Sequence, residues 1–216
     1  MITFLYRKLK KFESHRLEVV YDLLSGGERF LDIGCGGGSL VFMAKDKFND
    51  LYGIDISSTE IHKANNELKN ISRQDGGKIR FLQYNVEDGL PFNDDFFDTV
   101  TCIAVLQYIK DVLKLLDEIR RVISPGGEFI VQVPNIAWFP NRLDFLFGKL
   151  PITGYIDDLG LDWWNLHYFT MLTLKKILLK KGFKITQIKA SGIFAKQRRV
   201  WPTLLYGDFI IRSIKA

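Results

Sequence analysis

Cysteine, histidine and long apolar runs are scarce in this 216-residue sequence. Cys35 and Cys102 are its only cysteines and neither belongs to a CxxC pair, so we expect reduced thiols, no disulfide framework and no metal site. No run approaches the ~18 uncharged apolar residues that a membrane helix needs. Basic residues from Arg7 to Lys11 interrupt the start before a signal-peptide core can form, and we therefore expect a cytoplasmic protein.

The overall composition is that of one globular domain spanning residues 1–216. Hydrophobic residues make up 47% of the chain and charged residues 25%, which excludes a disordered chain. The net charge of +5 is unevenly spread, because residues 170–216 hold eleven Lys or Arg and the single acid Asp208. This excess predicts either a solvated basic surface or a surface for anionic partners. We expect no nucleic acid partner, because the chain lacks an RNA-binding signature.

Hydrophobic runs and turn residues predict alternating strands and helices. Strands are expected at 29–33, 51–54, 79–83, 99–103 and 128–133, with helices at 40–48, from Ser57 onward and at 112–123, where Asp111 serves as the cap. A last helix at 171–181, capped by Thr170, precedes two closing strands at 183–189 and 204–213 that suit an antiparallel hairpin. The prediction is a Rossmann-like, doubly wound, seven-stranded α/β sheet, mostly parallel with an antiparallel C-terminal strand.

A glycine-rich turn follows the first predicted strand of this sheet. Ser39 occupies the third glycine position of the dinucleotide pattern GxGxxG, which argues against a nicotinamide dehydrogenase. The pattern that fits is DxGxGxG, made by Asp32, Gly34, Gly36 and Gly38. An acid beside a loop without lysine suits a ligand that carries an ammonium group rather than a pyrophosphate. The alternative is a tight turn that binds no ligand.

Polar residues also end the next two predicted strands. Asp55 lies twenty-one residues after Gly34, a spacing that places its carboxylate where it can accept from both ribose hydroxyls. Asn85 ends the following strand and can accept from an adenine amino group, while backbone N–H groups of Val86 and Glu87 meet ring nitrogens. Three strand ends are thus predicted to converge on one nucleoside.

In these segments the chain resembles the class I S-adenosylmethionine-dependent methyltransferases. The matching stretches, within about residues 31–133, are LDIGCGGG, GIDIS, NVEDGLPF, FDTVTCIAVLQYIKD and EIRRVISPGGEFIVQVPN. The resemblance implies S-adenosylmethionine as cofactor and S-adenosylhomocysteine as product. It implies that Asp32 and the three glycines surround the methionine moiety, that Asp55 lies at the ribose and that Ile56 also binds the cofactor. It further implies that Asn85, Val86 and Glu87 lie near adenine and that the Ile103 carbonyl accepts from the ligand's amino group.

The sequence departs from that family at two positions. Relatives usually have Asp where Asn85 stands, and this exchange keeps an acceptor. They often have His where Gln107 stands, so the exchange removes one candidate base near the methyl group.

Residues 135–169 form the predicted acceptor side of the site. This stretch holds nine of the chain's 29 aromatic residues, which suggests either a lid over the acceptor or a satellite core. His167 is the candidate catalytic base, or it makes a structural hydrogen bond to the lid backbone. His15 and His62 are weaker candidates, and Asp157 with Asp158 either orient an acceptor hydroxyl or cap a turn.

The segment HYFT and the residues after it resemble a subgroup that includes ubiquinone-biosynthesis O-methyltransferases, MetW-like proteins and glycan methyltransferases. The acceptors of this subgroup differ widely. We expect methylation of a small-molecule acceptor that is sugar-, phenol- or lipid-linked, and the aromatic character of the lid favours O-methylation over N-methylation. The alternative is a noncatalytic, MetW-like regulatory protein that binds S-adenosylmethionine.

The N-terminal region 1–28 is expected to form a helical cap on the domain. Residues 1–12 combine apolar side chains with four basic ones, a composition compatible with peripheral contact to a membrane surface. The alternative is a helix packed on its own domain. The sequence makes no prediction of the oligomeric state.

Overall fold

A central sheet organises the computed structural model, which describes residues 13–70, 78–150, 165–193 and 197–216. Its strands are β2 (Gly27–Ile33), β3 (Phe48–Asp55), β4 (Lys78–Gln83), β5 (Phe97–Ile103), β6 (Ile123–Pro134), β7 (Phe183–Lys189) and β9 (Asp208–Lys215). Their order across the sheet is β4-β3-β2-β5-β6-β9-β7. The first five strands are mutually parallel, whereas β9 runs antiparallel to both β6 and β7. The predicted fold class is confirmed.

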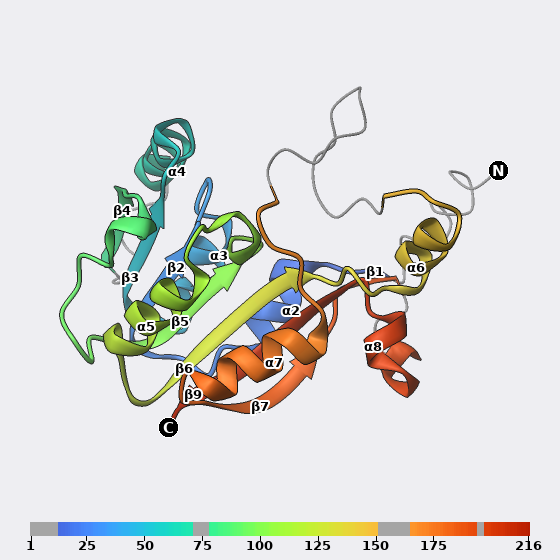
Figure 1. Cartoon of the computed structure of the whole chain (residues 1–216). Coiled ribbons are helices and arrows are strands. Elements are labelled where there is room, and N and C mark those ends of the chain that lie inside the picture. The colour runs from blue at the N-terminus through green and yellow to red at the C-terminus, as the bar shows by residue number, and fades with distance from the viewer. Residues whose placement is uncertain (1–12, 71–77, 151–164, 194–196) are drawn as a thin grey trace.

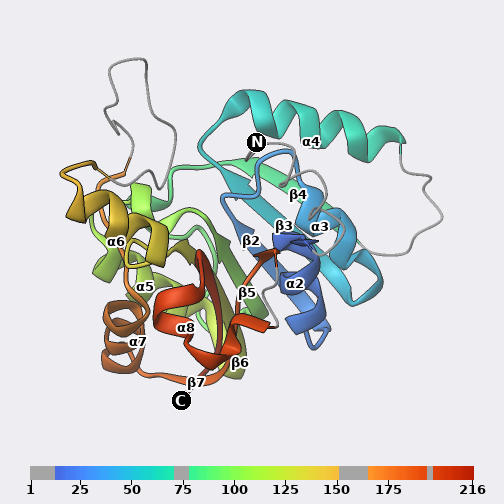
Figure 2. The ribbon, with the colours of Figure 1, turned by 90° about the vertical axis from the view of Figure 1, so that its right-hand side faces the viewer.

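Helices cover both faces of the sheet, as Figures 1 and 2 show. On one face lie α2 (Arg16–Leu23), α3 (Ser39–Met43) and α4 (Ser58–Asn70), and on the other lie α5 (Val112–Val122) and α7 (Met171–Lys180). Successive residues of β6 point to opposite faces, so that Phe129 and Val131 pack under α5 and α7 while Ile130 packs on the α2 side. Two apolar layers therefore enclose the sheet.

Smaller elements complete the described chain. They are the strands β1 (Glu13–Ser14) and β8 (Gly192–Ile193) and the helices α6 (Phe139–Leu146) and α8 (Pro202–Leu205). The described residues also contain four 3-10 turns, η2 (Ala44–Asp46), η3 (Val86–Asp88), η4 (Leu106–Tyr108) and η5 (Gln197–Val200). β1 pairs with β8 in a separate two-stranded sheet. None of the helices within the described ranges is long and apolar enough to cross a membrane.

Several element boundaries differ from the sequence prediction. The helix expected at 40–48 ends as the short turn η2, because Phe48 begins β3 and its ring stacks on Phe30 of β2 with the ring centroids 5.0 Å apart. The strand expected from residue 128 starts earlier, because β6 begins at Ile123, directly after α5, and includes Pro125–Gly127. Leu204 lies in helix α8 rather than in the closing strand.

The terminal and lid regions are described only in part. Residues 1–12 and 151–164 lie outside the described residues, and with them Asp157, Asp158 and three of the nine lid aromatics. Within the region expected to be a helical cap, α2 is helical, whereas Gly27 and Glu28 already belong to β2 because they pair with β3 and meet Asp98.

Candidate cofactor and acceptor site

The glycine loop follows the carboxyl end of β2, beside the point between β2 and β5 where the order of the sheet reverses. The amides of Gly34 and Cys35 both donate to the Ile54 carbonyl, at 2.8 and 3.1 Å, and fasten the loop to β3. Gly34, Gly36 and Gly38 have φ angles of +72°, +51° and +83°. A Cβ on Gly34 would lie 2.2 Å from Cγ2 of Val105, whereas one on Gly36 would meet nothing closer than 3.9 Å. Packing thus requires glycine at position 34, and Gly36 borders open space.

Asp32 lies buried behind this loop. Its Oδ1 accepts a hydrogen bond from Thr101 Oγ1 at 2.7 Å. Burial raises the pKa of Asp32 to about 7, the Thr101 hydroxyl opposes that rise, and the charge of Asp55 adds to it. No Lys or Arg of the described residues forms an ion pair with Asp32. A ligand ammonium fits here, because it would supply the missing positive charge.

Asp55 ends β3 and braces the glycine loop. Its Oδ2 accepts from the Gly36 amide at 2.9 Å and its Oδ1 from the Ser57 amide at 2.8 Å. Each carboxylate oxygen retains a further lone pair, so the side chain can also accept from ribose hydroxyls. Ile56, the next residue, is exposed beside it and offers an apolar surface to a base. Sequence reasoning assigned Asp55 to the ribose alone and missed its contact with the loop.

The third strand end carries the turn η3. Asn85 caps this turn, with its Oδ1 accepting from the Glu87 amide at 3.1 Å, and one lone pair of that oxygen is thereby used. The Glu87 carboxylate accepts from the Lys110 amide at 2.7 Å, and the Glu87 carbonyl accepts from Lys114 Nζ at 3.0 Å. The side chain of Glu87 therefore ties η3 to the start of α5. Val86 is half-buried against the core.

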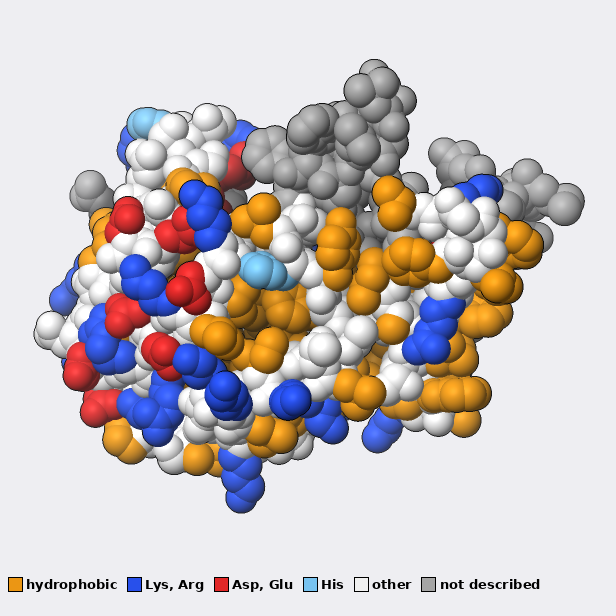
Figure 3. All heavy atoms as spheres, viewed as in Figure 1, with side chains coloured by type: hydrophobic (Ala, Val, Ile, Leu, Met, Phe, Trp, Pro, Cys, Tyr) orange, Lys and Arg blue, Asp and Glu red, His pale blue; other side chains and the backbone are white. Residues whose placement is uncertain are grey.

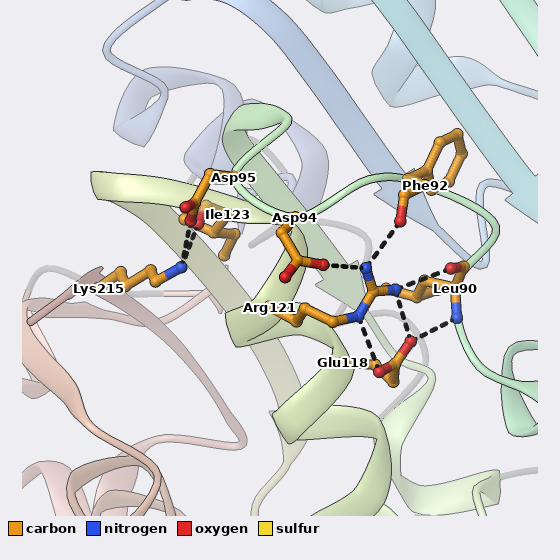
Figure 4. Close-up of polar contacts among 8 residues, drawn as sticks. All are labelled: Leu90, Phe92, Asp94, Asp95, Glu118, Arg121, Ile123 and Lys215. Carbon is orange, nitrogen blue, oxygen red and sulfur yellow. Dashed lines mark hydrogen bonds and ion pairs between the residues drawn. The ribbon is translucent and has the colours of Figure 1, made fainter.

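An ion-pair network fixes the loop that follows η3 (Figure 4). Arg121 on α5 donates to the carboxylates of Glu118 and Asp94 and to the carbonyls of Leu90 and Phe92, at 2.8 to 3.0 Å. Glu118 in turn accepts from the Leu90 amide at 2.9 Å. The hydrogen bonds from Arg121 lower the pKa of Glu118 to about 2. The loop beside Asn85 is thus anchored to α5.

The acceptor side adjoins the carboxyl ends of β5 and β6. Ile103 ends β5 and is followed by Ala104, whose φ of +59° turns the chain sharply toward η4. Gln107 in η4 is buried, and its Nε2 donates to the Ala104 carbonyl at 3.0 Å. Its Oε1 is buried without a hydrogen-bond partner among the described residues. Gln107 also lines a small pocket of about 10 Å³, together with Pro134, Ile136 and His167. The sequence analysis did not include Gln107 among the site residues.

The backbone of His167 is hydrogen-bonded to the backbone of Gln107. The Gln107 carbonyl accepts from the amides of Leu166 and His167, at 2.8 and 3.1 Å. The His167 ring places Nε2 3.2 Å from the Lys110 carbonyl. Because a carbonyl only accepts, Nε2 carries the hydrogen, and Nδ1 of the neutral ring is left as the acceptor. The ring thus makes a structural hydrogen bond, but to Lys110, which precedes α5, rather than to the lid backbone that the sequence predicted.

A second hollow lies on the outer side of His167, between α5 and α7. It measures about 480 Å³, and its walls include Val112, Phe169 and Ile177, with Lys176 and Lys180 at the edge. On the face drawn in Figure 3, apolar side chains gather in this hollow with basic ones beside them. His15 starts α2 and makes no side-chain cap, and His62 lies on α4. In the part of the chain that the structure describes, no three His, Cys, Asp or Glu side chains are grouped to hold a metal.

The fold and these strand ends define a doubly wound α/β protein with a nucleoside-type site. Comparison with known proteins identifies the class. Residues 31–131 match the methyltransferase domain family. An Aliivibrio fischeri ubiquinone biosynthesis O-methyltransferase is 26% identical over 132 residues, which are 60% of this chain and 55% of that protein. A sterol 4-C-methyltransferase of Caenorhabditis elegans is 35% identical over 123 residues, 57% of this chain and 35% of that protein.

Solved structures share the whole fold. A Methanosarcina mazei SAM-dependent methyltransferase has a TM-score of 0.69 at 24% identity, with 94% of this chain and 98% of that chain covered. The magnesium protoporphyrin IX methyltransferase of Synechocystis, solved with bound SAH, has a TM-score of 0.67 at 18% identity, with 93% and 82% covered. The matched domain, these relatives and the shared fold support a class I S-adenosylmethionine-dependent methyltransferase. It spans about half the length of the curated relatives it matches.

Proposed function

We propose that this protein transfers a methyl group from S-adenosylmethionine to a hydroxyl group of a small-molecule acceptor. The observation that carries the proposal is the meeting of Asp32, the open glycine loop at Gly36 and the Asp55 carboxylate at adjacent strand ends. Together they offer one buried negative charge, a surface free of side chains and an acceptor of hydrogen bonds. This set matches an ammonium group, a chain of methionine size and a ribose.

The cofactor contacts follow from these positions. Asp32 holds the amino-acid end of the ligand through its charge, and the Ile103 carbonyl accepts from the same ammonium group. Asp55 accepts from the ribose hydroxyls, and exposed Ile56 covers one face of the adenine. Asn85 and the Val86 amide meet the adenine edge, whereas the Glu87 amide already donates to Asn85 Oδ1. S-adenosylmethionine supplies an electrophilic methyl group on its sulfonium.

On the acceptor side, the protein's task is to hold an oxygen in line with that methyl group. Much of the rate of such a displacement comes from position, with the reacting atoms roughly 3 to 3.5 Å apart. Gln107 Oε1 lacks a partner among the described residues and can accept from the acceptor hydroxyl. His167, with Nε2 donating to Lys110, has Nδ1 free to take the proton.

The acceptor class is inferred from the named relatives and from the composition of residues 135–169. The relatives act on different atoms, since one is named as an O-methyltransferase and another as a sterol C-methyltransferase. The aromatic composition of residues 135–169 supports an acceptor with a planar or apolar part, including sugar-, phenol- and lipid-linked hydroxyl compounds. The noncatalytic alternative is favoured by one observation, the replacement of a frequent histidine by Gln107.

Calorimetric titration with S-adenosylhomocysteine tests the cofactor half. We expect one-to-one, micromolar binding, and a tenfold to hundredfold weaker affinity for Asp55→Ala, because charge-assisted hydrogen bonds of about 1.5 to 3 kcal/mol are lost. Asp50→Ala is the matched control, since Asp50 lies on the same strand but faces Arg80 at the surface. Unchanged affinity in folded Asp55→Ala would refute the assignment.

Transfer of a labelled methyl group to hydroxyl-bearing sugars, phenols and lipids tests the catalytic half. Product that disappears in Gln107→Leu and His167→Ala, with cofactor affinity retained, supports the proposed roles. Tight binding without product from any acceptor class would favour the noncatalytic protein.

A further inference from the structure

One end of the molecule exposes an unusual number of large apolar side chains. This end carries α6, α8 and η5, which lie together at the right of Figure 1 and face the viewer in Figure 2. We call it the α6–α8 surface. Between 54% and 91% of the surface of each of its most prominent apolar residues is open to solvent, and these residues are Phe145, Leu146, Phe147, Leu150, Val200 and Trp201. So large a cluster on one face indicates an interaction site.

The α6–α8 surface has a rigid base. Asn135, at the end of β6, is buried and donates through Nδ2 to the Tyr206 carbonyl at 2.8 Å, just after α8. Its own carbonyl accepts from Asn141 of α6 at 3.1 Å, and its amide donates to the Gly207 carbonyl at 2.9 Å. One buried asparagine therefore fixes both helices to the sheet, and the apolar residues are presented together.

Positive charge is concentrated in the same region. The described residues 139–150, 189–193 and 197–207 contain five Lys or Arg and a single acid, Asp144. The pairing of β1 with β8 brings the start of the described chain to the strand that precedes η5 and α8. The excess of positive charge favours an anionic partner at this end.

We infer that the α6–α8 surface docks on membranes that contain anionic lipid. Exposed Leu, Phe and Trp side chains bury favourably at the boundary between headgroups and acyl chains, while neighbouring Arg142, Lys149 and Arg199 meet the headgroup charge. A nucleic acid would gain little from exposed Leu146 and Leu150, and a second copy would bring like charges together. The bilayer is the partner that uses both features.

Docking in this orientation has a consequence for the proposed reaction. Ile136 helps to line the pocket beside Gln107, and the chain continues from it directly into α6. The acceptor side would therefore lie toward the bilayer, where lipid-linked hydroxyl compounds are found. The docking itself does not depend on methyl transfer.

Flotation of the full-length protein with vesicles tests the inference. Vesicles of phosphatidylcholine with phosphatidylglycerol should carry the protein upward, vesicles of phosphatidylcholine alone should carry much less, and added salt should reduce binding. We expect Phe147→Ser combined with Leu150→Ser and Trp201→Ser to weaken partitioning at least tenfold. The matched control is Leu172→Ser with Leu179→Ser, because these α7 leucines are 68% and 57% exposed but lie on another face.

Thermal unfolding, calorimetry and flotation together decide whether the α6–α8 surface docks on membranes. Thermal unfolding should show that both sets of variants are folded, and calorimetry should show unchanged affinity for S-adenosylhomocysteine, which separates docking from cofactor binding. Absence of flotation with either vesicle, or equal loss in the α7 control, would overturn the inference. It would also be overturned if the triple substitution left flotation intact, or if it abolished only self-association or RNA binding.

Discussion

At the scale of single residues, the site depends on a carboxyl group that the fold makes costly to ionise. Asp32 is enclosed by apolar strands, and its Thr101 hydrogen bond only partly offsets the loss of hydration. A group of this kind favours binding of a cation more than it favours stability of the free protein.

Asp32→Asn separates these two effects. Because the pKa of Asp32 is raised from its ordinary value near 4 to about 7, the folded protein binds a proton more tightly than the unfolded chain does. Stability is therefore lost as pH rises from about 4 through 7. We expect Asp32→Asn to be more stable than wild type near pH 8, by at most about 4 kcal/mol, with the difference vanishing near pH 4.

Urea unfolding of both proteins across that range measures the effect. The affinity for S-adenosylhomocysteine should fall in the same variant, because Asn offers no charge to the ammonium group. Equal stability of the two proteins at every pH would show that Asp32 is ionised at little cost in the free protein.

Gly34 supplies a second prediction at this scale. Gly34→Ala should destabilise the protein by roughly 2 to 4 kcal/mol, because the φ of +72° strains alanine and its Cβ would overlap Val105. Gly126→Ala is the matched control, since its φ is +75° but nothing lies within 4 Å, and about 1 kcal/mol is expected. Unfolding experiments on Gly34→Ala with and without Val105→Ala then isolate the destabilisation that comes from overlap with the Val105 side chain. The Val105→Ala substitution should relieve this overlap.

At the scale of elements, α5 supports the cofactor site from a distance. Arg121 and Glu118 hold the loop after η3 at four of its polar groups, and Glu87 ties η3 itself to Lys110. The helix thus fixes the position of Asn85 without contacting the ligand.

We expect Arg121→Met to lower the free energy of unfolding by about 1 to 3 kcal/mol near neutral pH, since several charge-assisted hydrogen bonds are lost. Because Arg121 depresses the pKa of Glu118 to about 2, the stabilisation is present above pH ~4.5 and is lost as pH falls toward ~2. Wild type and variant should therefore converge on acidification. Arg80→Met, which removes a more exposed pair with Asp50, should change stability by under about 1 kcal/mol.

Elements whose signals are local were predictable from sequence. Asp111 and Thr170 cap α5 and α7 as expected, and the order of strands and helices follows hydrophobic periodicity. The early end of α3 depends on Phe48 packing on Phe30, a contact between strands that no local pattern contains. Pro202 favours a helix start, and α8 forms there because Asn135 binds carbonyls at its end.

The same division applies to the site. Asp32, Asp55 and Asn85 were placed at strand ends from sequence because parallel strands bring their carboxyl ends to one edge. The bracing of the glycine loop by Asp55 and the buried Oε1 of Gln107 depend on segments far apart in the chain, and only the folded structure reveals them. Their roles in binding remain predictions of the proposed function.

At the scale of the whole molecule, the labelling rates of the two cysteine thiols measure how readily different parts of the fold open to solvent. Cys102 lies in the central strand β5 and is fully buried, whereas Cys35 belongs to the glycine loop. Burial raises the pKa of both thiols, so neither presents a reactive thiolate in the folded state. Labelling of Cys102 requires disruption of the sheet, and labelling of Cys35 requires only that the loop opens.

A disulfide reagent added near pH 8 to Cys35→Ala and Cys102→Ala proteins measures the two processes separately. We expect the Cys35 thiol to react faster than the Cys102 thiol, because loops open at lower free energy than central strands. S-adenosylhomocysteine at about 100 times its Kd should slow Cys102 labelling by roughly a hundredfold if opening there is global, since the ligand stabilises the folded state by about 2.7 kcal/mol. Rapid labelling of Cys102 in the ligand-free protein would contradict the closed central sheet. If S-adenosylhomocysteine left the labelling rate of Cys35 unchanged, the cofactor would bind away from the glycine loop.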